Sequence, residues 1–211
     1  MKRNLIIGIA LSTLMLSCTT ETETNEVEEQ VDEIQICNFT YQPETTVINW
    51  TAFKTTAKKG VSGKFDEFEV LVPNDGNEFM IQSLNSATIT IPVSSVNSDN
   101  PERDKKIDSL FFGAMNQTEI ISVLVKSITE ESAIVEITMN GKSVDYEGEI
   151  IVENETVKFN ATINLDDFEA QPAVESLNTA CKDLHTGDDG VSKLWSEVDI
   201  AVETTLKQNC K

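Results

Sequence analysis

The sequence predicts an all-β fold, and three observations support this prediction. Most of the chain after residue 45 alternates apolar and polar residues with a period of two, the pattern of a β-strand with one buried face. Polar turns separate these runs, and Asn140-Gly141 is the strongest hairpin signal among them. The 211 residues suffice for one domain with a sizeable core and do not require two. We therefore expect one antiparallel domain, either a closed barrel or a two-sheet sandwich, because a single open sheet would leave its apolar face uncovered.

The first strands show one irregularity. A strand is expected over residues 46–54, with apolar side chains at alternate positions Ile48, Trp50 and Ala52. In the run over residues 61–72, apolar residues occupy odd positions up to Phe65 and even positions from Phe68. This change of parity requires an extra residue between them, so we expect a β-bulge or a bend there. Another alternating strand follows over residues 87–93.

A series of hairpins makes up the second half of the chain. The alternation predicts strands over residues 121–126, 134–139, 144–153, 157–165 and 194–206. Asn140-Gly141 supplies the two positive φ angles of a type I′ turn, and Asn154-Glu155 turns the chain again. The strands on either side of these turns should therefore form a meander.

Two helical segments interrupt the strands. Asn100 suits the cap of the first helix and Pro101 its first turn. The expected apolar face of this helix is Ile107, Leu110, Phe111 and Ala114. The second helix is expected over residues 172–185, with Gly187 as its stop signal. Its expected apolar face is Ala173, Leu177, Ala180, Cys181 and Leu184. Both faces should cover an end of the β-structure.

The most specific part of the sequence runs from Ser86 to Met115. After an alternating strand, Arg103-Asp104 opens a helix that ends with Phe111-Phe112. This order, together with residues 60–65, resembles the YceI-like family of lipocalin-type lipid-binding barrels. The resemblance extends over residues 45–206. It implies an elongated antiparallel lipocalin-like β-barrel with two short helical inserts, which binds a ligand and does not catalyse a reaction.

The family resemblance also implies the ligand, a polyisoprenoid or fatty amphiphile held in the lumen without a cofactor. The chain departs from the family pattern at residues 47–50, where many members carry an Asp-x-x-His-Ser sequence, so no headgroup contact of that histidine is transferred here. The candidates for lining the lumen are Trp50, Phe65, Ile89, Ile91, Val123, Val135, Ile137, Ile150, Phe159, Val198 and Ile200. Core packing is the alternative for each, because a small barrel is either filled by its side chains or holds one ligand. A filled barrel in a structural or interaction lipoprotein is the alternative function.

The N-terminus carries targeting signals. Residues 1–17 have the charged start and apolar run of a secretory signal, and the run is too short to cross a bilayer. The sequence before Cys18 resembles a bacterial lipobox, which implies an acylated cysteine anchored in the bacterial envelope, at the periplasmic face of the outer membrane or at the cell surface. A chance cysteine is the alternative. Residues 18–36 contain seven acidic residues and no Lys or Arg, and should form a flexible tether to a domain over residues 37–211. This tether resembles a surface-export signal, and a plain solvated spacer is the alternative.

The net charge limits the partners of the protein. The chain has a formal charge of −20, which becomes −22 when the two cations of the signal segment are removed. The seven acidic residues of the tether account for part of this charge, which leaves −15 on the domain. Such a surface repels phosphate backbones and anionic headgroups, so we expect no nucleic-acid partner. Attachment to a membrane therefore depends on the acyl chains of Cys18, and the oligomeric state stays open.

Three cysteines remain besides Cys18. In an exported protein, one disulfide and one free thiol are expected. Cys37 precedes the first expected strand and Cys210 follows the last, so antiparallel pairing of those strands would bring the two together. A disulfide between Cys181 and either partner is the alternative.

The chain lacks a recognisable catalytic motif. It contains one histidine, no Gly-x-Ser-x-Gly and no His-Glu-x-x-His. His185 with Asp188 and Asp189 offers ligands to a divalent cation, but a helix end followed by a polar turn explains the same residues and is favoured. Arg103 and Asp104 suit an acid–base pair, a headgroup clamp or local hydrogen bonding at a helix start. We expect a binding protein without catalytic residues, metal or cofactor, and a hydrolase of envelope material is a third hypothesis.

Overall fold

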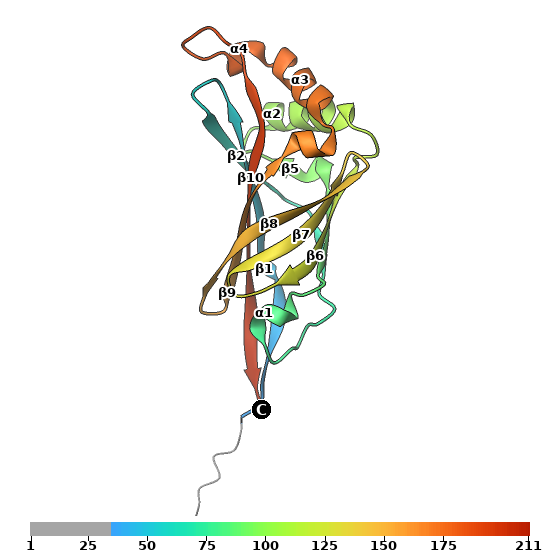
Figure 1. Ribbon diagram of the computed structural model, residues 1–211, viewed down its shortest axis with the longest axis vertical. Coiled ribbons are helices and arrows are strands. Elements are labelled where there is room, and N and C mark those ends of the chain that lie inside the picture. Colours follow the sequence, from blue (N-terminus) through green and yellow to red (C-terminus); the bar gives the residue numbers. More distant parts are fainter. Residues whose placement is uncertain (1–34) are drawn as a thin grey trace, which may run out of the picture. The chain divides into compact units, whose positions relative to one another are not determined.

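Ten antiparallel strands form one sheet that curls around an apolar interior (Figure 1). The computed structural model describes residues 35–211, so the expected signal segment, Cys18 and the tether up to residue 34 lie outside the described residues. The strands in chain order are β1 (Cys37–Lys54), β2 (Lys59–Phe65), β3 (Glu69–Leu71), β4 (Thr88–Pro92), β5 (Val96–Asn97), β6 (Ile120–Ile128), β7 (Ser132–Met139), β8 (Lys142–Glu153), β9 (Thr156–Asn164) and β10 (Leu194–Cys210). Their spatial order is β3-β4-β6-β7-β8-β9-β10-β1-β2-β5.

The sheet curls into a barrel because two of its segments bend at adjacent positions. The chain leaves β2 at Phe65 and resumes as β3 at Glu69, and the turn η1 (Val93–Ser95) separates β4 from β5. β2 pairs with β5 and β3 pairs with β4, so the two bent segments stay paired on both sides of the corner. At the corner itself, the Asp66 amide donates to the Ser95 carbonyl oxygen at 3.0 Å. The bend expected after Phe65 is confirmed, and the fold is a barrel and not a sandwich.

The predicted alternation is confirmed in the central strands. Val135, Ile137 and Met139 of β7 are buried, whereas Ile134 on the opposite face is 38% exposed. The turn between β7 and β8 has φ angles of 52° at Asn140 and 69° at Gly141, as a type I′ hairpin requires. From β6 to β10, each strand pairs with the next strand in the chain. The meander therefore contains five strands, whereas the two predicted turns implied three.

Three strands differ most from the prediction, and one of them is β10, which runs to Cys210 and not to residue 206. β1 begins at Cys37 and not at residue 46, and its pairing with β10 shifts between Gln42 and Val47. Thr204 of β10 lies opposite this bulge. In β6 a second register shift follows Val125, and the next buried residue is Ile128, of opposite parity. Such shifts depend on a partner strand that is distant in the sequence, so local periodicity does not reveal them.

The helices are short and lie mostly at one end of the barrel (Figure 1). They are α1 (Met80–Ser83), α2 (Pro101–Lys106), α3 (Gln171–Ala180) and α4 (Lys182–His185). Three further helical turns accompany them: η2 (Ile107–Phe111) is a π-helical turn, and η3 (Phe112–Ala114) and η4 (Leu165–Phe168) are 3₁₀ turns. Asn100 caps α2 as expected, because its side-chain oxygen accepts from the Arg103 amide at 3.0 Å. Within residues 35–211, no helix has the length and apolar character needed to cross a bilayer.

The predicted helix faces are only partly correct. Ala114 is exposed, and the buried residue at this end is Phe112, because the wide π-type turn η2 shifts the helical period. In the second segment the helix breaks at Cys181, so Ala180 and Leu184 are exposed. Val174 and His185, absent from the expected apolar face, are buried in their place. The helix α1 was not predicted.

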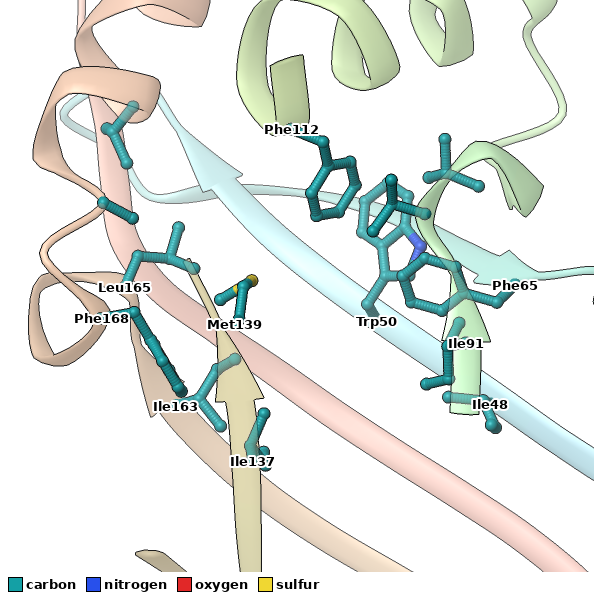
Figure 2. Packing of buried hydrophobic residues seen from close by; sticks show 14 of the residues in the cluster. Ile48, Trp50, Phe65, Ile91, Phe112, Ile137, Met139, Ile163, Leu165 and Phe168 are labelled. Atoms are coloured by element: carbon teal, nitrogen blue, oxygen red, sulfur yellow. The ribbon is translucent and has the colours of Figure 1, made fainter. Parts of the chain in front are cut away.

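The largest buried cluster lies between the helices and the upper half of the barrel (Figure 2). Figure 2 shows Phe112 projecting from the helical segment toward Trp50 of β1, with Phe65 beside the indole. Phe168 of η4 is fully buried and packs in the same cluster. The helical segments therefore act as a hydrophobic cover for this end of the barrel.

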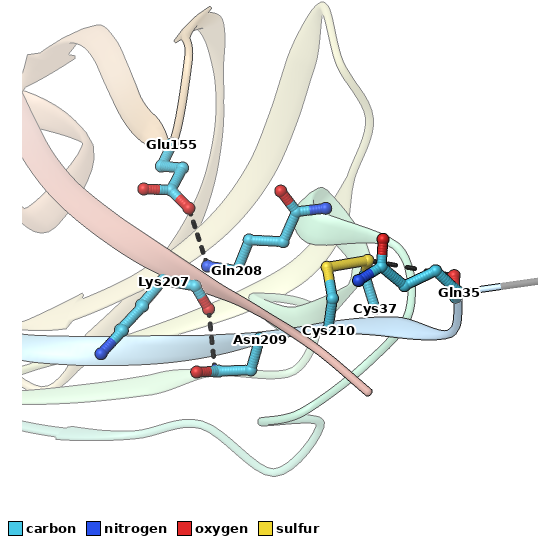
Figure 3. Close-up of a disulfide and its surroundings, with 7 residues drawn as sticks. All are labelled: Gln35, Cys37, Glu155, Lys207, Gln208, Asn209 and Cys210. Carbon is cyan, nitrogen blue, oxygen red and sulfur yellow. Dashed lines mark hydrogen bonds between the residues drawn. A yellow bond between two sulfur atoms is a disulfide. The ribbon is translucent and has the colours of Figure 1, made fainter.

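The opposite end is held together by a disulfide between the first and last strands (Figure 3). Cys37 and Cys210 face each other across the β1–β10 pair and are joined through their sulfur atoms, whereas Cys181 is a buried free thiol. Next to the disulfide, the Gln208 amide donates to Glu155 Oε1 at 2.8 Å (Figure 3). The disulfide thus joins the two longest strands at their outer ends.

Removing this disulfide is expected to destabilise the fold strongly. The bonded cysteines are 173 residues apart, and a bridge across so long a segment restricts the unfolded chain most. The double variant Cys37→Ser, Cys210→Ser should lose about 4 to 5 kcal/mol of unfolding free energy in urea titrations. A reductant should lower the unfolding midpoint of the wild type and leave that of the variant unchanged. Equal midpoints for reduced and oxidised wild type would contradict the expectation.

Candidate functional site

The inward side chains do not fill the barrel. A first cavity of about 150 Å³ lies in its middle and lower part, and side chains from every strand except β5 contribute to its wall. Nine of the eleven residues that the sequence places in the lumen line this cavity: Phe65, Ile89, Ile91, Val123, Val135, Ile137, Ile150, Phe159 and Ile200. Aliphatic residues from facing strands dominate the wall, so the space is suited to a hydrocarbon chain.

A second cavity of about 130 Å³ lies under the helical cover. The two remaining predicted lumen residues, Trp50 and Val198, are in its wall. Phe111 of η2 and Leu177 of α3 close it from above. The Trp50 indole lies close to Gly63 of the neighbouring strand, where an added Cβ atom would approach it to 2.3 Å. A side chain at position 63 would therefore push the indole out of its place.

The two cavities are neighbours. Five side chains line both of them: Phe65, Ile121, Met139, Ile163 and Ile200. These five residues form the partition between the cavities. Met139 is unbranched and adapts its shape more readily than the β-branched isoleucines. The interior is therefore neither solid nor one open tunnel, but two compartments separated by side chains.

Several wall residues were absent from the sequence-based set. Ile48 and Met139 belong to the alternating runs, and their parity alone was sufficient to include them. The helical residues Phe111 and Leu177 were expected to cover the barrel, but the sequence gave no sign of a cavity beneath them. Tyr41 lies before the β1 bulge, which periodicity does not detect. Thr46 and Thr204 have the parity of Ile48 and Ile200, and were left out because they are polar.

The cavities are electrically neutral. No Asp, Glu, Lys, Arg or His side chain lines either of them in the described part of the chain. The polar side chains of the first cavity are Tyr41, Thr46 and Thr204. Burial raises the pKa of Tyr41, so its phenol stays protonated at neutral pH. Because an unpaired charge is costly to transfer into such a space, the cavities select uncharged groups.

Arg103 and Asp104 contact the protein itself and line neither cavity. Arg103 Nε donates to Ser98 Oγ at 2.7 Å, and the Ser98 amide donates to Asp104 Oδ1 at 2.9 Å. The Ser98 hydroxyl also donates to the Asp104 carboxylate. Both residues therefore hold the start of α2 against the segment after β5, as local hydrogen bonding at a helix start predicts. Their role is to position the helical cover over the second cavity.

The loop that follows α4 brings no metal ligands together. His185 is buried, and its Nδ1 lies 3.0 Å from Asn178 Oδ1. Asp189 Oδ2 accepts from Thr56 Oγ1 at 2.6 Å, in a separate contact. Within residues 35–211, no group of three His, Cys, Asp or Glu side chains is placed to hold a metal ion. The histidine therefore serves as a buried hydrogen-bonding group where α4 ends.

Comparisons with known proteins agree with this geometry. The sequence model of the YceI-like domain matches residues 39–206. A UPF0312 protein of Staphylococcus aureus strain MRSA252 is 34% identical over 104 residues, which are 49% of this chain and 58% of that protein. The chain thus matches little more than half the length of this relative.

Solved structures show the same fold. A structure described as a polyisoprenoid binding domain from Saccharophagus degradans, implicated in plant cell wall breakdown, has a TM-score of 0.52 and 13% identity. The match covers 82% of this chain and 99% of that domain. BcnA of Burkholderia cenocepacia has a TM-score of 0.51 and 15% identity over 77% of this chain and 96% of its own.

The buried histidine is expected to make the stability depend on pH. Burial lowers the pKa of His185 below its ordinary value of 6.5, and the nearby Lys54 lowers it further. The unfolded chain then takes up a proton at a higher pH than the folded chain, so this contribution to stability falls as the pH drops below 6.5.

Urea unfolding between about pH 8 and pH 5 should test this dependence on wild type and His185→Gln. Below about pH 6.5 the wild type should lose more unfolding free energy than the variant, in which this titration is absent. Parallel curves for the two proteins would show that His185 makes no such contribution.

Proposed function

The chain belongs to the YceI-like family, and from this membership we propose that it binds a long apolar chain, a polyisoprenoid or fatty amphiphile, inside its barrel. The observation that carries the proposal is the pair of adjacent apolar cavities between the strands and the helical cover. The fold neighbour from Saccharophagus degradans is itself described as polyisoprenoid binding, which supports the choice of ligand class.

Burial of hydrocarbon is a sufficient driving force for this function. Each methylene transferred from water into an apolar cavity contributes about 0.8 kcal/mol, so ten contribute about 8 kcal/mol. Each cavity alone has room for only a short segment of a chain. A long ligand therefore passes from one cavity into the other, and the partition side chains, above all Met139, rotate to admit it.

A barrel filled by its own side chains is the alternative that the sequence left open. The two cavities argue against it, because a filled interior leaves no space of this size. Catalysis has no support in the described residues: His185 contacts an amide, and Arg103 and Asp104 are engaged with Ser98. Binding and sequestration is the function that this interior serves best.

We place this binding module in the bacterial envelope. The signal-like residues 1–17, the lipobox-like Cys18 and the acidic tether support a protein anchored by acyl chains. The disulfide between Cys37 and Cys210 suits an oxidising compartment outside the cytoplasm. Globomycin treatment combined with mass spectrometry of the mature N-terminus tests the anchor, and an unmodified Cys18 in the mature protein would contradict it.

Filling the first cavity is expected to weaken binding. Val135 points into the cavity and Ile134, its neighbour in β7, points outward, so Val135→Phe and Ile134→Phe form a matched pair. If the added ring displaces about two methylenes of the ligand, the affinity of Val135→Phe for a fluorescent fatty probe should fall about tenfold. The affinity of Ile134→Phe should be that of the wild type.

Two further measurements keep this test decisive. Ile200→Phe fills the partition from another strand, and should also weaken binding if Val135→Phe proves too unstable to study. Denaturing extraction and mass spectrometry of wild-type protein purified from its native envelope should release a long-chain apolar molecule. Empty protein that also fails to bind added isoprenoids and fatty amides would overturn the proposed function.

A further inference from the structure

The first cavity contains one polar feature, a chain of three hydroxyl groups. Tyr41 Oη lies 2.8 Å from Thr46 Oγ1, and Thr46 Oγ1 lies 2.8 Å from Thr204 Oγ1. All three side chains line the cavity, and Thr204 is only 7% exposed. We call these residues the hydroxyl relay.

The β1 bulge creates the relay. Tyr41 and Thr46 have opposite parity in β1, so a regular strand would point them to opposite faces. Thr46 shares the inward parity of Ile48 and contacts Thr204. The shift in pairing with β10 between Gln42 and Val47 brings Tyr41 to the same side, where it contacts Thr46. Formation of the strands does not require polar side chains inside the barrel. The rest of the first-cavity wall is apolar.

The relay has hydrogen-bonding capacity left for a ligand. Three hydroxyl groups carry three protons, and the two hydrogen bonds between them use only two. One proton and several lone pairs thus remain, and because the hydroxyls rotate, the relay either donates or accepts at its end. Such a group fits an alcohol or an amide, each of which also donates and accepts.

The surroundings of the relay disfavour an anion. No cationic side chain lines either cavity in the described residues, and the charged group that acts on the Tyr41 phenol is Glu44, an acid. A carboxylate or phosphate buried here would lose its hydration without gaining a counter-charge. A neutral headgroup avoids this cost.

The other cavity offers no competing polar site. Both indole N–H groups of this cavity already donate to backbone carbonyl oxygens. Trp195 Nε1 donates to the Thr55 carbonyl oxygen at 2.7 Å, and Trp50 Nε1 donates to the Lys64 carbonyl oxygen at 3.4 Å. Along β10, Thr204 lies four residues beyond Ile200 of the partition, roughly 13 Å away at the rise of a β-strand. The relay and the second cavity thus lie at opposite ends of the apolar space.

From this arrangement we infer that the ligand has an uncharged hydrogen-bonding headgroup, such as an alcohol or amide, which binds at the hydroxyl relay of Tyr41, Thr46 and Thr204. Its apolar chain then extends past the partition into the second cavity under the helices. This inference rests on the proposed function, because it specifies the chemistry and the orientation of the ligand in the same barrel.

The test compares three probes of equal chain length on the full-length protein: a long-chain primary alcohol, the corresponding fatty acid at neutral pH, and the corresponding hydrocarbon. The wild type should bind the alcohol more tightly than either of the others. Thr204→Val and Tyr41→Phe each remove one hydroxyl and keep the side-chain shape. Each should weaken alcohol binding about three- to tenfold, the range of one net hydrogen bond, and leave hydrocarbon binding unchanged.

Thr205→Val is the matched control, because this neighbour in β10 lies outside the relay and pairs its hydroxyl with Thr156. It should bind all three probes as the wild type does. Equal losses for alcohol and hydrocarbon in Thr204→Val, or no loss for either, would overturn the headgroup assignment while the barrel still binds chains. Failure of every probe, hydrocarbon included, would overturn the proposed function itself.

Discussion

Antiparallel pairing across ten strands curls the sheet around its apolar face, and the rest of the structure follows from this curvature. The curved sheet separates opposite walls, and a strand can direct only alternate side chains inward. Those side chains are mostly Val and Ile, which are too short to fill the space between the walls of this barrel, and two cavities remain. The hollow interior therefore follows from the curvature of the sheet and from the aliphatic residues on its inner face, and needs no special binding motif.

Irregular backbone segments determine the position of the helical cover at one end of the interior and of the polar groups at the other. The corner at Val93–Ser95 leads through β5 to the helices, where Ser98, Arg103 and Asp104 hold the start of the helical cover. At the other end, the bulge in β1 brings the Tyr41 hydroxyl inward beside Thr46, and the disulfide holds the first and last strands together beyond it. Regular pairing thus makes the apolar wall, and deviations from it place the cover and the polar groups.

Much of the barrel could be predicted from the sequence because the alternation of buried and exposed residues in a strand is visible in a short stretch of sequence. Residues 134–165 show this well: inward and outward positions alternate, and Asn140-Gly141 has the φ angles that a type I′ turn needs. The bulges could not be predicted, because the partner of Gln42 lies in β10, more than a hundred residues away. For the same reason, Tyr41 was missed as a cavity residue. Thr46 and Thr204 share the parity of Ile48 and Ile200 and were missed because they are polar. The eleven apolar candidates all line one cavity or the other.

The most direct test of this account is a crystal structure of the full-length protein saturated with a long-chain alcohol. Continuous ligand density is expected through both cavities, with Phe65 or Met139 moved from the partition to let the chain pass. Ligand density confined to a single cavity, or found only on the outer surface of an unchanged barrel, would contradict it.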